Sequence, residues 1–223
     1  MFEPKAHIIA IDGTKGTGRK TLCFELAVTL LHNAQRTAIV LADDSPLRNT
    51  LKKRMMLLPQ LLTPAIINRQ DFYKDANKYN AVIIPETSPD DELAVTASTY
   101  ITILPREKSY AQKFQTNRNY LNSLFELKKK IAATYNHSLN WIVCENNLKK
   151  TIADSPTKEL EAKAKIYGFR LSPPLNYRQS YKNNVCGISA QDKALPLLKK
   201  DLTFEDICAK REIVKLAEFI FGA

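Results

Sequence analysis

The stretch I-I-A-I-D-G-T-K-G-T-G-R-K-T-L, residues 8–22, decides the fold of this chain. Four apolar residues at 8–11 predict a buried strand, a glycine-rich turn follows, and residues 22–31 have a helical pattern. A strand, a loop and a helix in this order are what a phosphate-binding loop needs. Glycines let backbone N–H groups turn toward phosphate oxygens, and the helix N-terminus adds partial positive charge.

The side chains of this loop suggest how a phosphorylated ligand is held. Lys20 is placed to reach the β and γ phosphates, and the Thr21 hydroxyl is placed to hold Mg²⁺. Arg19 departs from the pattern, because a side chain stands where glycine backbone normally approaches phosphate. A glycine-rich turn that binds nothing is the alternative. The candidate cofactor contacts are Gly16, Thr17, Gly18, Arg19, Lys20 and Thr21.

Composition and charge limit the class of protein. The chain has 223 residues and 44% hydrophobic residues, which predicts a single domain, 1–223, with a sizeable core. Lys and Arg number 33 against 23 Asp and Glu, so the formal net charge is +10. Such a charge favours polyanionic partners, nucleic acid or an anionic membrane surface; a basic surface that only keeps the protein soluble is the alternative.

Cysteine and histidine usage argues against disulfides and metal centres. The cysteines are far apart, without any C-x-x-C pair, which predicts reduced thiols, and the three histidines are isolated. No apolar run approaches the ~18–20 residues of a membrane span, and no signal peptide is evident. We therefore expect a cytoplasmic protein. The cysteines are Cys23, Cys144, Cys186 and Cys208.

Apolar strands alternate with helical patterns along the chain. This alternation predicts an α/β fold with a parallel, doubly wound sheet of the P-loop NTPase type and helices on both faces. Residues 59–70 show no regular pattern. The predicted strands are 7–11, 37–42, 81–84, 99–104, 139–144 and 169–171. The predicted helices are 19–33, 47–58, 92–97, 120–135, 157–167, where Gly168 supplies the C-cap, and 203–221.

Polar residues follow three other predicted strands, at the edge where parallel sheets bind ligands. Asp43 or Asp44 is placed to orient Mg²⁺ or an attacking water, although either also suits an Asx turn or a helix N-cap. Glu86 is the carboxylate nearest to the place of a Walker B aspartate; an ordinary loop acid is the alternative. The Asn146 amide suits the edge of an adenine base, although the Asn-Asn pair taken alone favours a turn.

Several motifs together resemble one family. Lys15 and Gly16 precede Lys20 and Thr21 with the spacing of the deviant Walker A motif K-G-G-x-G-K-S/T, the mark of the ParA/MinD class. N-W-I-V-C-E-N-N-L at 140–148 is similar to the D-W-I-V-x-R-N-R-L of the MipZ division-plane positioning ATPases. Other similar segments are 167–173, 178–182 and 209–213. The chain thus resembles the MipZ family, and the similarity is thin between about 60 and 80.

The resemblance implies an ATP-dependent switch that forms a homodimer around the nucleotide. In that family the dimer binds DNA non-specifically, is recruited by the partition protein ParB and inhibits assembly of the division protein FtsZ, so a nucleoid-associated protein is expected. By carry-over, Lys15 reaches the partner's nucleotide, Lys20 is the Walker lysine, Thr21 holds Mg²⁺ and Asn146 contacts adenine. Asp43 is the best equivalent of the family's catalytic D-x-D after the second strand, and Glu86 remains the candidate Mg²⁺ ligand after the third. The candidate DNA-binding residues are Arg178, Lys182 and Arg211.

Departures from the family pattern cluster at the nucleotide chemistry. Thr17 and Arg19 replace glycines, and P-E-T-S at 85–88 replaces the Walker B run D-T-P-G. The alternative hypothesis is therefore a relative that binds DNA or a partner with weak or absent hydrolysis. A metabolic P-loop enzyme, similar to thymidylate kinase or dethiobiotin synthetase, is a third hypothesis, which leaves the similarity at 140–182 unexplained.

Overall fold

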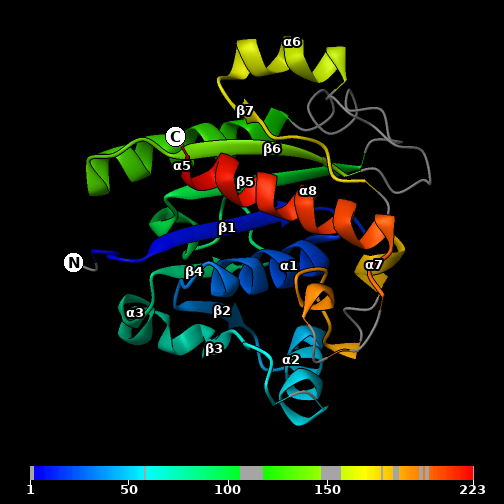
Figure 1. The fold of residues 1–223 in the computed structure, drawn as a ribbon. Coiled ribbons are helices and arrows are strands. Elements are labelled where there is room, and N and C mark those ends of the chain that lie inside the picture. The colour runs from blue at the N-terminus through cyan, green and yellow to red at the C-terminus, as the bar shows by residue number, and fades with distance from the viewer. Residues whose placement is uncertain are drawn as a thin grey trace.

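The computed structural model shows one parallel sheet of seven strands in the order β3-β2-β4-β1-β5-β6-β7 (Figure 1). Every strand pairing in it is parallel, so the predicted α/β fold is confirmed. The structure describes residues 3–57, 59–105, 118–146, 157–176, 178–182, 186–195, 198 and 201–222. The strands are β1 (His7–Gly13), β2 (Thr37–Leu41), β3 (Ala65–Asn68), β4 (Ala81–Ile84), β5 (Thr99–Pro105), β6 (Asn140–Asn146) and β7 (Arg170–Leu171).

Helices connect the strands and cover the sheet (Figure 1). The α-helices are α1 (Arg19–His32), α2 (Pro46–Leu57), α3 (Phe72–Asp75), α5 (Arg118–Tyr135), α6 (Lys158–Tyr167), α7 (Gln179–Lys182) and α8 (Phe204–Phe221). Short 3₁₀ segments are Arg69–Asp71, Ala76–Lys78, Ala94–Thr96 and Asp192–Ala194.

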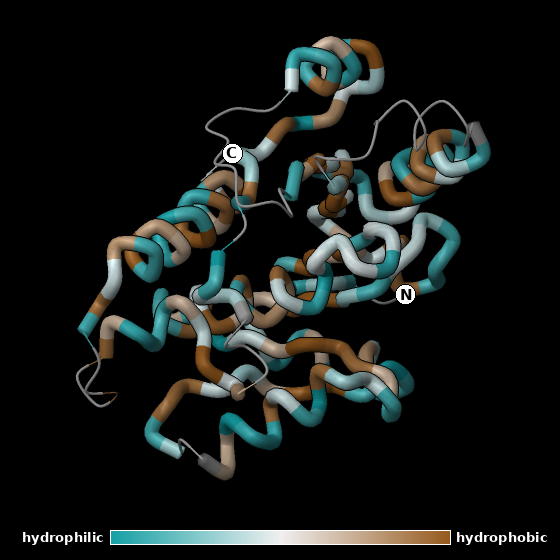
Figure 2. Tube along the Cα trace, turned by 90° about the vertical axis from the view of Figure 1, so that its right-hand side faces the viewer, coloured by the Kyte–Doolittle hydropathy of each residue, from teal (hydrophilic) through white to brown (hydrophobic). Residues whose placement is uncertain are grey.

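The sheet separates two hydrophobic cores, because successive side chains of a strand point to opposite faces. On one face Ile9 and Ile11 of β1 belong to the cluster that includes residues of α1, α2 and α8. On the other face Ile8 and Ala10 belong to the cluster with residues of α3, α5 and α6. Figure 2 shows hydrophilic and hydrophobic residues alternating along the outer helices, as expected of helices with one buried face.

Single residues cap the ends of two helices. Gly168 ends α6 in the left-handed conformation, with φ of 66°. Thr203 opens α8, where its side chain accepts a hydrogen bond from the Asp206 amide and the Asp206 carboxylate accepts one from the Thr203 amide. The Gly168 cap is thus the one that the sequence predicted, whereas Thr203 was placed inside the predicted helix 203–221 and instead precedes it.

The sequence pattern left the segment after α2 without a predicted fold, and the structure supplies one. Residues 65–68 form β3, which pairs in parallel with β2 at the edge of the sheet, and α3 follows it. The strand is four residues long and comes directly after Pro64, and only Ile67 of it is buried.

A buried ion pair joins the C-terminal segment to α2. Arg54 donates from Nη1 and Nη2 to the two carboxylate oxygens of Asp192, at 2.5 and 2.8 Å, and both side chains are fully buried. Arg54 also donates to the carbonyls of Leu62 and Gly187, and His32 of α1 contacts Asp192 at 3.3 Å. This cluster fixes α1, α2 and the segment around Asp192 against one another.

Among the residues that the structure describes, no helix is long and apolar enough to cross a membrane. All four cysteines are free thiols. Burial raises the pKa of the Cys144 thiol to about 12.

Candidate functional site

The loop between β1 and α1 has the backbone of an anion-binding turn. Gly16 and Gly18 adopt positive φ angles of 87° and 91°, which residues with a Cβ rarely adopt. Gly18 is the N-cap of α1, and the Leu22 amide donates to the Gly18 carbonyl at 2.8 Å. The first N–H groups of a helix have no partner within the helix, so those at the start of α1 suit an anion.

The start of α1 favours a different motif register from the one predicted. The phosphate-loop motif G-x-x-x-x-G-K-[ST] fits with Gly13 and Gly18 as its two glycines. Arg19, the first residue of α1, then stands at the lysine position, and Lys20 stands at the hydroxyl position. The predicted register, one residue further on, had placed Lys20 as the lysine and Thr21 as the hydroxyl.

This register changes the interpretation of Arg19 and Lys15. Arg19 does not replace a loop glycine, so its side chain does not obstruct the backbone that faces phosphate. The early lysine of the deviant motif falls at Thr14 in the new register, and the exposed Lys15 comes one residue later. The predicted contact of Lys15 with a partner's nucleotide stays a prediction.

Close packing explains why Gly13 carries no side chain. A Cβ there would lie 2.6 Å from the Thr17 Oγ1 and 3.3 Å from the Arg19 Cγ, so the Arg19 stem runs over Gly13. Thr17 is buried, and its hydroxyl donates to the Thr14 carbonyl at 2.8 Å. The Thr17 side chain closes the turn. Only the Thr17 backbone therefore remains for the predicted contact with a cofactor.

Two cations converge on one carboxylate at this loop. The Lys20 Nζ lies 3.3 Å from the Glu86 Oε1, and the Arg19 Nη2 lies 3.8 Å from the same oxygen. Glu86 follows β4 in the left-handed conformation, with φ of 61°. The next residue, Thr87, donates its amide to the Ile11 carbonyl of β1 and its hydroxyl to the Ile84 carbonyl. Glu86 is thus held beside the loop, as its predicted place near a nucleotide requires.

Asn146 also reaches the loop, from the end of β6. Its amide Nδ2 donates to the Thr17 carbonyl at 2.7 Å and lies 2.6 Å from where a Cβ on Gly18 would be. Asn146 therefore supports the loop backbone directly. Its predicted contact with adenine stays a prediction.

Asp12 is a residue that the sequence reasoning missed. Its carboxylate accepts a hydrogen bond from the Gly13 amide at 2.6 Å and one from the Tyr120 hydroxyl at 2.5 Å. Tyr120 also contacts the Thr102 hydroxyl, and burial together with Asp12 raises the Tyr120 pKa well above its usual value. This network ties α5 to the first amide of the loop. The available signal was an acidic residue inside an otherwise apolar strand.

The acidic residues after β2 lie apart from these contacts. The Asp43 side chain is 90% exposed, and its carboxylate pairs with the Arg48 guanidinium at 3.3 Å. Arg48 also donates to the carbonyls of Leu41 and Ala42 and to Asn68, so it fixes the ends of β2 and β3. The predicted catalytic role of Asp43 stays a prediction.

The residues that were predicted to contact DNA lie in different environments. The Arg178 side chain is 11% exposed and donates to the Glu212 Oε1 from Nη2 at 2.5 Å and from Nε at 3.1 Å. This ion pair argues against Arg178 as a phosphate contact, because its donors point into the protein. Arg211 is exposed on α8. The Lys182 side chain lies outside the described residues.

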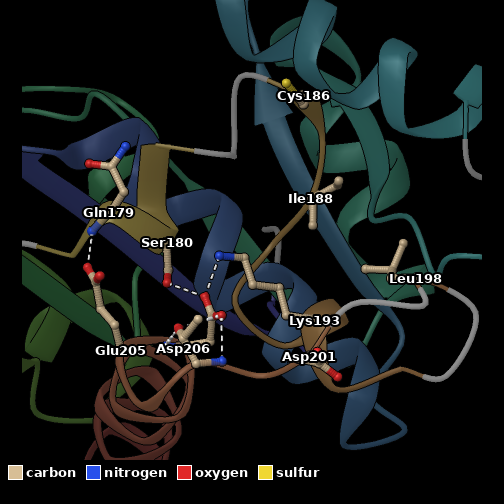
Figure 3. Close-up of a pocket in the computed structure, with 10 residues that line it drawn as sticks. Gln179, Ser180, Cys186, Ile188, Lys193, Leu198, Asp201, Glu205 and Asp206 are labelled. Carbon is tan, nitrogen blue, oxygen red and sulfur yellow. Dashed lines mark hydrogen bonds and ion pairs between the residues drawn. The ribbon is translucent and has the colours of Figure 1, made fainter.

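A cavity of about 450 Å³ lies beside α7 and the start of α8 (Figure 3). Lys193 and Ser180 point toward Asp206 in it, each at 2.5 Å from the Asp206 Oδ1 (Figure 3). Although burial opposes ionisation, these hydrogen bonds hold the Asp206 pKa well below its usual value. Asp201 and Glu205 also line the cavity, so its charge does not suit phosphate groups.

Comparison of the fold with solved structures identifies similar proteins. An ATP complex of McdA from Cyanothece matches with a TM-score of 0.62 and 13% identity over 98% of this chain and 97% of that chain. The septum site-determining protein MinD of Pyrococcus horikoshii, complexed with Mg-ADP, gives 0.55 and 16% over 97% and 96%. This chain has the fold of the MinD and ParA ATPases.

The same fold also occurs in a biosynthetic enzyme. Cobyrinic acid a,c-diamide synthase from Mycobacterium smegmatis, with a bound ATP analogue and magnesium, matches with a TM-score of 0.59 and 15% identity over 98% of this chain and 97% of that chain. No protein-family model matches the sequence, and no curated protein sequence matches it. These likenesses establish the fold, and the function has to be argued from the site.

The donor set at the loop does not fit the Mg²⁺ ion that the fold suggests. Mg²⁺ requires oxygen ligands in near-octahedral geometry. The hydroxyl position of the motif holds the ammonium group of Lys20, which has only donors. Glu86, the nearby carboxylate, is already paired with that ammonium group. Thr21, the predicted ligand, is one residue further along α1 and so about 100° further around the helix.

Proposed function

We propose that this chain is a nucleotide-binding switch of the ParA/MinD class that has lost efficient ATP hydrolysis. The phosphates of ATP would bind at the start of α1, facing Arg19 and Lys20. The bound state would act through formation of a homodimer and through partner binding. The observation that carries the proposal is the convergence of both cations on Glu86 at this helix start.

Three features of the loop support phosphate binding. Two glycines with positive φ leave backbone N–H groups available to turn inward, and α1 contributes the partial charge of its N-terminus. The Arg19 side chain passes over Gly13, so its guanidinium group lies on the same side of the loop as the Lys20 ammonium group. An arginine keeps its charge at every physiological pH and binds phosphate oxygens in pairs.

The same residues support the loss of hydrolysis. A water attacking the γ phosphate has to be oriented, and charge on the transferred group has to be neutralised by metal and cations. Pro85 stands at the end of β4, and the Glu86 carboxylate beside it faces Lys20. Asp43, the other candidate, points into solvent next to Arg48. Binding without turnover is enough for a switch, because its output is a shift between conformations.

The test is ATP binding and turnover by the full chain. We expect calorimetry to detect ATP binding, ultracentrifugation to show an ATP-dependent dimer, and phosphate release to stay at the buffer background. Arg19→Ala should weaken ATP binding about tenfold, because it removes a charged hydrogen-bond donor. Lys74→Ala, on the exposed surface of α3, is the matched control. The absence of ATP binding, or unchanged binding by Arg19→Ala, would refute the proposal.

The MipZ resemblance supports a finer proposal about partners. The dimer would bind non-specific DNA and a ParB-like protein, and it would inhibit the assembly of FtsZ. A net charge of +10 supports the DNA part of this proposal. Light scattering of FtsZ with and without the ATP-loaded chain tests the division part: equal polymer mass in both samples would exclude it.

A further inference from the structure

Lys20 occupies the place where a phosphate loop normally ligates its metal. In the register set by the start of α1, Lys20 is the second helical residue and the motif expects a serine or threonine there. A hydroxyl oxygen at this position binds Mg²⁺, whereas an ammonium group repels it and itself binds phosphate oxygens. The substitution thus exchanges a metal ligand for a cation.

We infer that Lys20 replaces the divalent cation, so that this loop binds the phosphates of a nucleoside triphosphate without Mg²⁺. The inference rests on the proposed function, whose site it describes more closely. The positive charge that Mg²⁺ supplies to nucleotide phosphates comes here from the chain, through the Lys20 ammonium group beside the Arg19 guanidinium group.

The position of Glu86 supports this inference. Its Oε1 lies 3.3 Å from the Lys20 Nζ and 3.8 Å from the Arg19 Nη2, so this carboxylate faces two cations. The loop after β4 fixes it there, since the Thr87 amide is bonded to β1 at the Ile11 carbonyl, 3.1 Å away. A carboxylate that is paired with two cations is a poor ligand for a metal ion. Its position does show where both cations can bind one negatively charged oxygen.

The charge balance of the group points the same way. Lys15, Arg19 and Lys20 supply three positive charges against the carboxylates of Asp12 and Glu86, so a net positive charge remains at the loop and the start of α1. The helix terminus adds to this positive potential. A triphosphate therefore meets a positive site before any metal binds.

The test compares ATP affinity in two buffers by calorimetry on the full chain. One buffer holds excess Mg²⁺ and the other holds excess EDTA. We expect dissociation constants that agree within about threefold. Binding in Mg²⁺ that disappears in EDTA would overturn the inference and leave the proposed function standing. The absence of binding in both buffers would overturn the inference and the proposed function together.

Two variants of Lys20 sharpen the comparison. Lys20→Thr restores the hydroxyl of the motif, and we expect its affinity in EDTA to fall about tenfold and to recover when Mg²⁺ is added. Lys20→Arg keeps the charge and should bind in both buffers. Lys74→Thr on α3 makes the same change at an exposed site and should behave as wild type. Binding by Lys20→Thr in EDTA at the wild-type affinity would contradict the inference, with circular dichroism confirming that the variant is folded.

Discussion

Lys20 and Glu86 come from two different strand ends, and the Lys20 Nζ lies 3.3 Å from the Glu86 Oε1 at the start of α1. Lys20 belongs to the helix after β1, and Glu86 belongs to the loop after β4, the neighbouring strand. In this pair the carboxylate binds the same ammonium group that the proposed phosphate contact uses. The relationship gives Glu86 a role opposite to that of a metal ligand, namely competition with the incoming phosphate.

Glu86→Gln should therefore raise the affinity for ATP. Removing the carboxylate charge frees both cations for phosphate, and because the pair is partly exposed we expect a gain of about threefold. Calorimetric titration in EDTA measures it. Glu92→Gln, at an exposed acid further along the same loop, is the control and should change little. A lower affinity of Glu86→Gln in Mg²⁺ buffer would instead identify Glu86 as a metal ligand.

Asn146→Ala separates two roles of the amide. If Asn146 only supports the loop through the Thr17 carbonyl, the variant should lose the same factor of affinity, about fivefold, for ATP and for inorganic tripolyphosphate. A contact with adenine would make the loss larger for ATP alone. Competition titrations with the two ligands measure both factors, and Asn33→Ala, an exposed asparagine after α1, serves as the control.

Asp192→Asn should destabilise the fold by about 3 kcal/mol at neutral pH, because Arg54 would remain buried without its charge partner. Urea unfolding measures this difference, and Asp44→Asn at an exposed site should stay within about 0.5 kcal/mol of wild type. An Asp192→Asn variant as stable as wild type would show that the ion pair contributes no net stability.

The same pair gives a pH dependence with a definite sign. Burial opposes ionisation of Asp192, but hydrogen bonds from Arg54 and His32 outweigh it and lower the pKa to about 2 from the usual 3.8. A lowered pKa contributes stability that is fully present above the unfolded value and is lost as pH falls through the folded one. The difference between wild type and Asp192→Asn should therefore shrink between pH about 4 and pH about 2.

The sequence was sufficient for the fold and for the place of the loop, but not for its register. Gly13 and Gly18 match the general motif G-x-x-x-x-G-K-[ST] in one alignment, and Lys20 and Thr21 match it in the other, so each alignment fits two of its letters. Only the residue at which α1 begins distinguishes them, and helix boundaries are uncertain by one or two residues in sequence-based prediction. A shift of one residue was enough to exchange the roles of Arg19 and Lys20.

Contacts between residues that are far apart in the sequence could not be predicted, for a different reason. Arg178 pairs with Glu212, which is 34 positions away, and Arg54 pairs with Asp192, which is 138 positions away. No local pattern reports such a partner. The sequence indicated Arg178 only as a candidate DNA contact and gave no role to Arg54, whereas the folded chain uses each one to hold its C-terminal segments.

Arg178 and Arg211 should consequently behave differently with DNA. Arg211 is exposed on α8, so Arg211→Ala should weaken binding of the ATP-loaded chain to duplex DNA uniformly across sequences and lower the magnitude of the salt slope by about one. Arg178→Gln should leave that slope unchanged and instead reduce stability, because it removes the charged partner of the half-buried Glu212. Fluorescence anisotropy at several salt concentrations and urea unfolding measure the two effects. An equal loss of salt slope in both variants would mean that the Arg178 side chain leaves Glu212 to contact phosphate, and an unchanged slope in both would place the DNA-binding surface away from α8.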